Sequence, residues 1–240
     1  MRIGSRLLCF AAFFGMLSGI AAAGTVYTNL APAGPAFTCC GGWVVSGAES
    51  LFPFLPREQP AFAFQAAGDF EFTELDVAVG WMGGTNRINV ELRADSGNLP
   101  GAILESWIED NIPSILVCCS VESLTYAAGN STGAISFMDG SQYWVVVRPG
   151  ATDTVAAWAL NNTGATGLGA SDAGSGFLFS AKTDIAAFAV QGTPTPEPAT
   201  WQLAGLAALS AIVLRARLRP QFRALAQAVA HVPRHGRRRD

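Results

Sequence analysis

Apolar and polar residues alternate most clearly in the middle of the chain. In residues 87–93 (RINVELR), Ile88, Val90 and Leu92 alternate with polar or charged residues. This period of two is typical of a strand with one buried face. Turn-forming residues follow in 95–101 (DSGNLPG), and 102–109 (AILESWIE) resume the extended pattern. The pattern therefore predicts strand, loop and strand over residues 86–109.

Other segments extend this reading along the chain. Residues 70–81 (FEFTELDVAVGW) alternate as well, but their apolar phase shifts between Phe72 and Leu75, and a β-bulge would absorb one extra residue there. Residues 142–148 (QYWVVVR) are apolar on both faces, which indicates a central strand. Shorter strand candidates are 155–160 (VAAWAL) and 185–190 (IAAFAV), whereas the Gly- and Asn-rich residues 161–176 are typical of loops.

Together these segments predict the fold class. Strand patterns separated by turn signals recur along residues 24–192, and we find no amphipathic helix pattern and no internal repeat in that part of the sequence. This organisation is typical of an antiparallel β-sandwich of jelly-roll type. We therefore expect one all-β domain over residues 24–192, flanked by segments of different character.

The N-terminal segment has the pattern of a secretory signal peptide. A short basic start, MRIGSR, precedes an uncharged run from Leu7 to Ala23, and Ala21 and Ala23 give an A-x-A cleavage site before Gly24. We expect residues 1–23 to direct export and to be removed. The alternative is an uncleaved membrane anchor, because the uncharged run has 17 residues and about 17 is the lower limit for a membrane span.

A second apolar segment lies near the other end. Pro196-Glu197-Pro198 precedes an uncharged run of 16 residues, 199–214, which is followed at once by three arginines, Arg215, Arg217 and Arg219. A run of this length is about 24 Å long as a helix, a marginal span, and the arginines favour a cytoplasmic end. Residues 220–240 form a basic tail whose apolar residues recur at helical spacing, which predicts a surface helix.

Charge separates the body of the chain from its ends. Residues 24–196 carry 16 Asp and Glu against five Lys and Arg, a net charge of −11, although the whole chain has a net charge of −3. Such an acidic body argues against a nucleic-acid partner, which would be bound through phosphate neutralisation.

The cysteines of the body form two adjacent pairs, Cys39–Cys40 and Cys118–Cys119. In an exported protein an even count favours disulfides, and adjacent cysteines are poorly spaced for zinc. Neighbours on a strand point to opposite faces, so we expect one cross-link with a local irregularity or a strained pairing within a Cys-Cys unit. Free buried thiols are the alternative.

Candidate catalytic residues are few. Residues 24–196 contain no histidine, which excludes Ser-His-Asp sites, Cys-His sites and histidine-ligated zinc in the body. Two groups of carboxylates could supply the acid and base of a glycoside hydrolase: Glu71, Glu74 and Asp76, and Glu105, Glu109 and Asp110. Solvated charges on strand faces explain the same residues. We therefore expect a protein that is not an enzyme, and assign no catalytic, cofactor-binding or metal-ligating residue.

Two other kinds of side chain suggest binding. Loop residues that could offer oxygen ligands to a structural calcium ion are Asp95, Asn98, Asp139, Asp153 and Asp172, although turn formation explains them equally. Aromatic side chains that could stack on sugars are Trp43, Trp81, Trp107, Trp144 and Trp158. Core packing is the simpler explanation for most of these, with Trp43 expected to be the exception.

The C-terminal residues resemble a known signal. Pro196-Glu197-Pro198, the apolar run and the cluster of Arg215, Arg217 and Arg219 are similar to the PEP-CTERM sorting signal of exported Gram-negative bacterial proteins. The resemblance implies recognition of residues 193–219 by an exosortase-type enzyme and a transient membrane anchor. The family's signals usually end soon after the arginines, whereas this chain continues to Asp240.

The body resembles the choice-of-anchor R domain. The similar stretches are 84–107 (GTNRINVELRADSGNLPGAILESW), 143–150 (YWVVVRPG) and 156–167 (AAWALNNTGATG). This resemblance implies a β-rich extracellular domain and supplies no catalytic residue. We therefore expect an exported structural or adhesive protein of the cell surface or the exopolysaccharide matrix of a biofilm. The alternatives are a carbohydrate-binding module and a carboxylate-dependent glycosidase.

Overall fold

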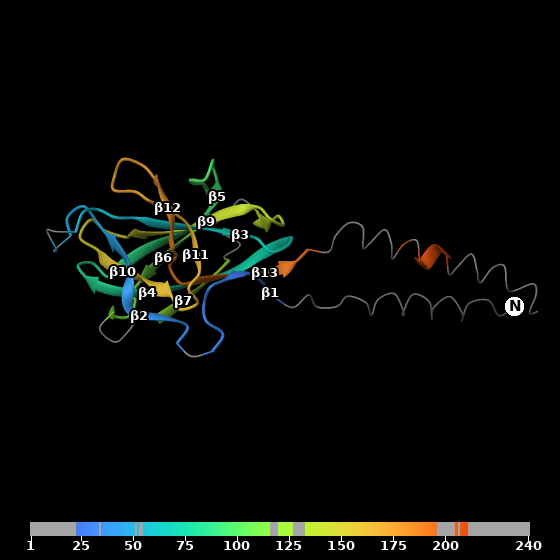
Figure 1. Ribbon diagram of the computed structural model, residues 1–240, viewed down its shortest axis with the longest axis horizontal. Coiled ribbons are helices and arrows are strands. Elements are labelled where there is room, and N and C mark those ends of the chain that lie inside the picture. The colour runs from blue at the N-terminus through green and yellow to red at the C-terminus, as the bar shows by residue number, and fades with distance from the viewer. Residues whose placement is uncertain are drawn as a thin grey trace, which may run out of the picture. The chain divides into compact units, whose positions relative to one another are not determined.

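The computed structural model describes residues 23–33, 35–50, 52, 55–115, 120–126, 133–195, 205 and 207–210. The chain divides into two units, Met1–Thr195 and Pro196–Asp240. The described part of the first unit contains thirteen strands arranged in two antiparallel sheets (Figure 1). The predicted all-β class is therefore confirmed.

The two sheets share the strands almost equally. Sheet A has the order β1 (Gly24–Thr28), β13 (Phe188–Pro194), β4 (Phe70–Gly83), β10 (Val155–Asn161) and β2 (Phe37–Ser46), with β7 (Ser120–Thr125) and β8 (Ser136–Phe137) also paired to β4. Sheet B has the order β12 (Leu178–Asp184), β11 (Thr166–Ser171), β3 (Pro60–Gln65), β9 (Gln142–Pro149), β5 (Arg87–Asp95) and β6 (Pro100–Asp110).

Four of the strand pairs are nested in the sequence. The hairpin β5–β6 is enclosed by the pair β4–β7, which is enclosed by β3–β9, which is enclosed in turn by β2–β10. The nested pairs alternate between the sheets: β5–β6 and β3–β9 lie in sheet B, and β4–β7 and β2–β10 lie in sheet A. Residues far apart in the chain therefore become neighbours, as Phe37 and Asn161 do.

The hydrophobic core lies between the inner faces of the sheets. Val77 and Val79 of β4, Leu92 of β5 and Trp158 of β10 are all fully buried in it. Burial of each such aliphatic side chain stabilises the fold by about 1.5–3 kcal/mol. The core therefore accounts for the alternation seen in residues 87–93, because Ile88, Val90 and Leu92 all contribute to it.

The strand, loop and strand predicted over residues 86–109 are confirmed as β5 and β6. The predicted bulge is confirmed as well. Gln191 pairs with Glu74 and Gly192 with Phe72, so Thr73 is an extra residue in β4. The central strand is β9, which lies between β3 and β5.

Two strand predictions need correction. The segment 161–176 was expected to be a loop, but Thr166–Ser171 forms β11 between β3 and β12. Glycine is suited to this strand, because a Cβ at Gly167 would lie only 3.2 Å from the Cγ2 atom of Ile185. The candidate strand 185–190 begins later than expected, since β13 starts at Phe188 and Ala186 forms only an isolated bridge.

The outer face of sheet B carries a second, smaller apolar cluster. Its buried members are Ala61, Ala63, Trp144, Val146 and Ala170. Leu99, Leu168 and Phe177 pack against them and are partly buried. This face is therefore partly covered by the turn after β5 and the segment after β11, and polar groups beside the cluster are shielded from water.

The C-terminal unit is described at Gly205 and Ala207–Ser210, which are helical. In the described part of the chain no helix has the length and apolar character needed to cross a membrane. The predicted signal peptide, most of the predicted sorting segment and the basic tail lie outside the described residues.

Candidate functional site

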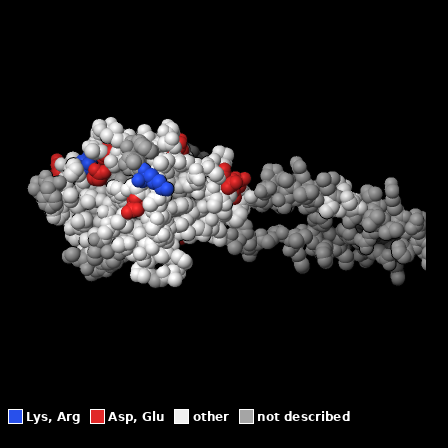
Figure 2. Space-filling model, viewed as in Figure 1, with Lys and Arg blue, Asp and Glu red and all other residues white. Residues whose placement is uncertain are grey.

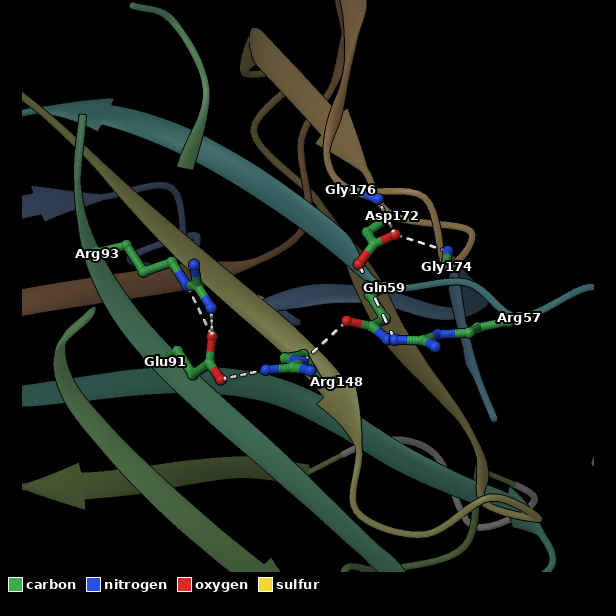
Figure 3. Close-up of polar contacts among 8 residues, drawn as sticks. All are labelled: Arg57, Gln59, Glu91, Arg93, Arg148, Asp172, Gly174 and Gly176. Carbon is green, nitrogen blue, oxygen red and sulfur yellow. Dashed lines mark hydrogen bonds and ion pairs between the residues drawn. The ribbon is translucent and has the colours of Figure 1, made fainter. Parts of the chain in front are cut away.

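The candidate site lies on the outer face of sheet B. Three of the five cationic residues of the body, Arg57, Arg93 and Arg148, come together there (Figure 3). Arg93 lies on β5 and Arg148 on β9, which are neighbouring strands, and Arg57 precedes β3. The face in Figure 2 is mostly uncharged, with small separate groups of acidic and basic residues.

Glu91 organises the group. Its residue is only 4% exposed, and its carboxylate accepts a hydrogen bond from Nε of Arg93 at 2.7 Å and another from Nη1 of Arg148 at 2.8 Å. A buried carboxylate needs such partners, because its desolvation is otherwise very costly. Arg93 is itself fixed by a bond from Nη1 to the Gly101 carbonyl (3.0 Å) and lies over the Phe177 ring.

Arg148 is held at a second point by Gln59. Its Nε donates to Oε1 of Gln59 at 2.8 Å, and Gln59 is buried. A third of the Arg148 side chain remains exposed. No hydrogen bond to a described residue engages its Nη2, so this nitrogen is oriented by the network and free to donate outward.

Arg57 is attached more loosely. Its Nη2 lies 4.0 Å from Oδ2 of Asp172, which is an ion pair without a hydrogen bond, and 36% of its side chain is exposed. Asp172 is fixed by its own turn, since its Oδ1 accepts from the amides of Gly174 (2.6 Å) and Gly176 (3.0 Å). Within the described residues, Arg57 therefore keeps its donors uncommitted.

A hollow of about 280 Å³ opens between these side chains. We call it the arginine pocket; it is lined by Arg57, Gln59 and Arg148 and by two loop segments, 47–48 and 149–152. Backbone hydrogen bonds tie the loops together, from Gly47 to Thr154 at 2.9 Å and from Glu49 to Thr152 at 2.7 Å. The pocket is therefore preformed, and two guanidinium groups line it.

A larger hollow of about 520 Å³ lies where β11 diverges from β3. It is lined mainly by apolar groups, with Tyr27 and Lys182 among its polar side chains. Burial raises the pKa of Tyr27 to about 12 despite a hydrogen bond with Asn29, so its phenol stays neutral. This hollow lacks a second fixed charged group among its described lining residues, so it gives less information about a ligand than the arginine pocket.

The five tryptophans among the described residues do not form a sugar-stacking platform. Trp107, Trp144 and Trp158 are buried. Trp43 was expected to be exposed but is half-buried: it packs against the core, with its ring centroid 5.3 Å from that of Phe62. Trp81 is also half-buried against the core. Each described tryptophan thus contributes to packing.

Of the five candidate calcium ligands, the structure brings only two together. The structure brings Asp95 and Asn98 together in one turn, where the Asn98 amide donates to Asp95 at 3.3 Å. Asp153 instead accepts from the amide of Thr85, and Asp172 from glycine amides. The Asp139 amide donates to Asp69 at 2.8 Å. In the described ranges no group of three or more His, Cys, Asp or Glu could hold a metal ion.

Hydrogen bonding determines the ionisation of Asp95. Burial raises the pKa of its carboxyl group, but hydrogen bonds from Trp144 Nε1 (2.7 Å), Gln142 Nε2 (2.6 Å) and backbone amides outweigh burial and bring the pKa below its ordinary value. Asp95 therefore acts as a charged anchor for the small apolar cluster through Trp144, and its oxygens are already occupied.

The predicted acid and base carboxylates are only partly assembled. Burial and then the charge of Asp76 raise the pKa of Glu74. Burial likewise raises the pKa of Glu109, followed by the charges of Glu122 and Asp110. Asp110 is paired with Arg87 at 2.6 Å, which lowers its pKa. Glu71 is exposed, and Glu105 is buried with its Oε2 unpartnered among the described residues.

The backbone of β2 is irregular at the first pair of cysteines. Cys39 and Cys40 lie in β2, where Ala159 pairs with Gly42 and Leu160 with Thr38, so residues 39–41 are extra. Cys118 and Cys119 lie outside the described residues, and the disulfide itself stays a prediction.

No known protein family, curated protein or solved structure matches the chain. The arginine pocket was not predicted from the sequence either, because its two arginines are separated by 91 positions. One feature of the sequence could have drawn attention to these residues. The acidic body has only five Lys and Arg, so the role of each arginine could have been asked separately.

Proposed function

We propose that the protein is an exported, non-enzymatic structural or adhesive component of the cell surface or exopolysaccharide matrix of a Gram-negative bacterium. One observation supports this most strongly: an acidic all-β body without histidine lies between a signal-peptide pattern and a Pro-Glu-Pro, apolar and arginine pattern. The first segment exports the chain, and the second holds it at the membrane until an exosortase-type enzyme processes it.

The strand pairing supports a jelly-roll body. Nested pairs β5–β6, β4–β7, β3–β9 and β2–β10 are what results when one long hairpin is rolled into two sheets, and jelly rolls occur in lectin and capsid domains. In this scheme β1, β11, β12 and β13 extend the two sheets. Such a body suits a passive surface or binding module.

A carbohydrate-binding role is the second candidate, and the arginine pocket favours it. The tryptophans are used for packing, so a stacking mode has no support from them. A ligand would instead be held by charge and hydrogen bonds at Arg57 and Arg148.

The sorting role can be tested by changing the motif. In a host with an exosortase-type enzyme, a triple variant with alanine at positions 196, 197 and 198 is expected to accumulate uncleaved in the membrane fraction, because the enzyme has lost its recognition element. The natural chain is expected at the surface or in the medium. Cell fractionation with immunoblotting distinguishes the two.

The variant Pro194→Ala is the matched control, since it changes a nearby proline outside the motif, and it should behave like the natural chain. If the triple variant were distributed as the natural chain is, the proposed sorting would be contradicted.

A further inference from the structure

We propose that the arginine pocket binds the carboxylate of a uronic acid residue in an acidic polysaccharide. The polysaccharide source rests on the proposed function, whereas the preference for a carboxylate rests on the pocket itself.

The donors of the pocket are oriented before any ligand arrives. Glu91 and Gln59 hold Arg148 at two of its nitrogens, with Nη2 left over, and Arg57 has no hydrogen bond to a described residue. Planar guanidinium groups match carboxylate oxygens in geometry and form strong charge-assisted hydrogen bonds. Both arginines line one hollow, so one carboxylate can meet two guanidinium groups.

The guanidinium groups of the site outnumber the carboxylates that pair with them. Arg57, Arg93 and Arg148 face two carboxylates, of Glu91 and Asp172. Because Arg93 shares Glu91 with Arg148, the positive charge of Arg148 is not fully offset by its ion-pair partner. With Glu49 at the rim as a third carboxylate, the surroundings of the pocket are close to neutral in a body with a net charge of −11, so an anion is repelled less here than from most of the remaining body.

The rim limits how much negative charge can be bound. Glu49 lies beside the pocket, where its Oε2 accepts a hydrogen bond from Thr152 Oγ1 at 2.9 Å. A second anionic group on the same sugar would lie near this carboxylate. The site therefore suits a singly charged carboxylate better than a doubly charged phosphate.

The size and lining of the hollow define the rest of the ligand. Its 280 Å³ is just below the roughly 300–1,000 Å³ of typical ligand pockets, so it suits one sugar residue. Gly47, Ala48, Gly150 and Thr152 line its walls, and no large apolar side chain does so among the described residues. A hydroxylated ring that carries a carboxylate fits these small walls beside two guanidinium groups, whereas an apolar peptide side chain would meet no large apolar surface there.

Affinity electrophoresis of the full-length protein tests the proposal. Gels cast with polygalacturonate should retard the natural protein, and gels cast with dextran should not. Arg57→Gln should weaken retardation by polygalacturonate roughly tenfold, since it removes a charge-assisted contact worth about one order of magnitude. Arg57 makes only a loose ion pair, so this variant is expected to fold.

The matched control is Lys182→Gln, which removes one positive charge from an exposed residue of β12 that does not line the arginine pocket, and it should leave retardation unchanged. Equal loss in both variants, or no retardation of the natural protein, would overturn the proposal.

Calorimetry with small ligands tests whether the pocket prefers a sugar carboxylate to a neutral sugar or to free phosphate. Galacturonate should bind, and galactose and inorganic phosphate should bind at least tenfold more weakly. Equal binding of phosphate would overturn the uronate assignment. If the protein binds galacturonate but is not exported, only the proposed function is contradicted. If it is exported but does not bind galacturonate, only this inference is overturned.

Discussion

Glu91 is the residue on which the outer face of sheet B depends most. It is buried and forms ion pairs with Arg93 at 2.6 Å and Arg148 at 2.8 Å. Removal of one partner from a buried ion pair is strongly destabilising, because the remaining charge stays buried without compensation. At the scale of single residues, this carboxylate both stabilises the fold and orients the proposed site.

Glu91→Gln is therefore expected to lower the free energy of unfolding by about 3 kcal/mol, because Arg93 and Arg148 lose their shared counter-charge. Urea denaturation followed by tryptophan fluorescence measures this change. Asp110→Asn is the control: it removes the exposed pair with Arg87 and should leave the midpoint unchanged, as exposed pairs contribute little. Similar shifts in both variants would show that Glu91 has no special structural role.

At the scale of elements, the turns determine how the strands meet. Gly84 joins β4 to β5 with a φ of +70°, and a Cβ there would overlap the carbonyl oxygen of Asp153. Gly97, in the turn between β5 and β6, has a similar φ of +67° but nothing within 4 Å of a Cβ position. The two glycines share a left-handed backbone conformation, but only at Gly84 would an added side chain meet neighbouring atoms.

Alanine at these positions separates the two effects. Gly97→Ala should cost about 1–2 kcal/mol, the strain of a left-handed residue. Gly84→Ala should cost at least about 3 kcal/mol, because overpacking adds to that strain. Thermal and urea unfolding of both variants measure the loss of stability. An equal loss in the two variants would contradict the close approach of the Asp153 carbonyl to Gly84.

Elements defined by local pattern could be predicted from the sequence. The alternation of residues 87–93, the turn at 95–101 and the phase shift before Leu75 lie within short windows, and β5, β6 and the bulge at Thr73 follow from them. β11 could not be predicted, since its glycines are a loop signal locally. Pairing with β3 and β12 makes it a strand.

The candidate site shows the same limit at longer range. The alternation places Glu91 and Arg93 on the outer face, but nothing local indicates that Arg148 lies beside them. That contact depends on the pairing of β5 with β9, in which Arg148 is opposite Asn89. Arg57 and Asp172 are brought near by strands β3 and β11. Because nested pairing joins distant segments, a site built across it is not visible in any short window.

At the scale of the whole molecule, we propose that the acidic two-sheet body is synthesised between an export segment and a sorting segment. The mass of the mature protein tests this most directly. We would recover the protein from the native host's envelope and medium and determine its intact mass, before and after thiol reduction and alkylation.

We predict a species that begins near Gly24, ends near Pro196 and gains mass by alkylation only after reduction, because we expect both end segments to be removed and the cysteines to be paired. A species that still carries residues 199–240 would contradict C-terminal processing and indicate a retained membrane anchor.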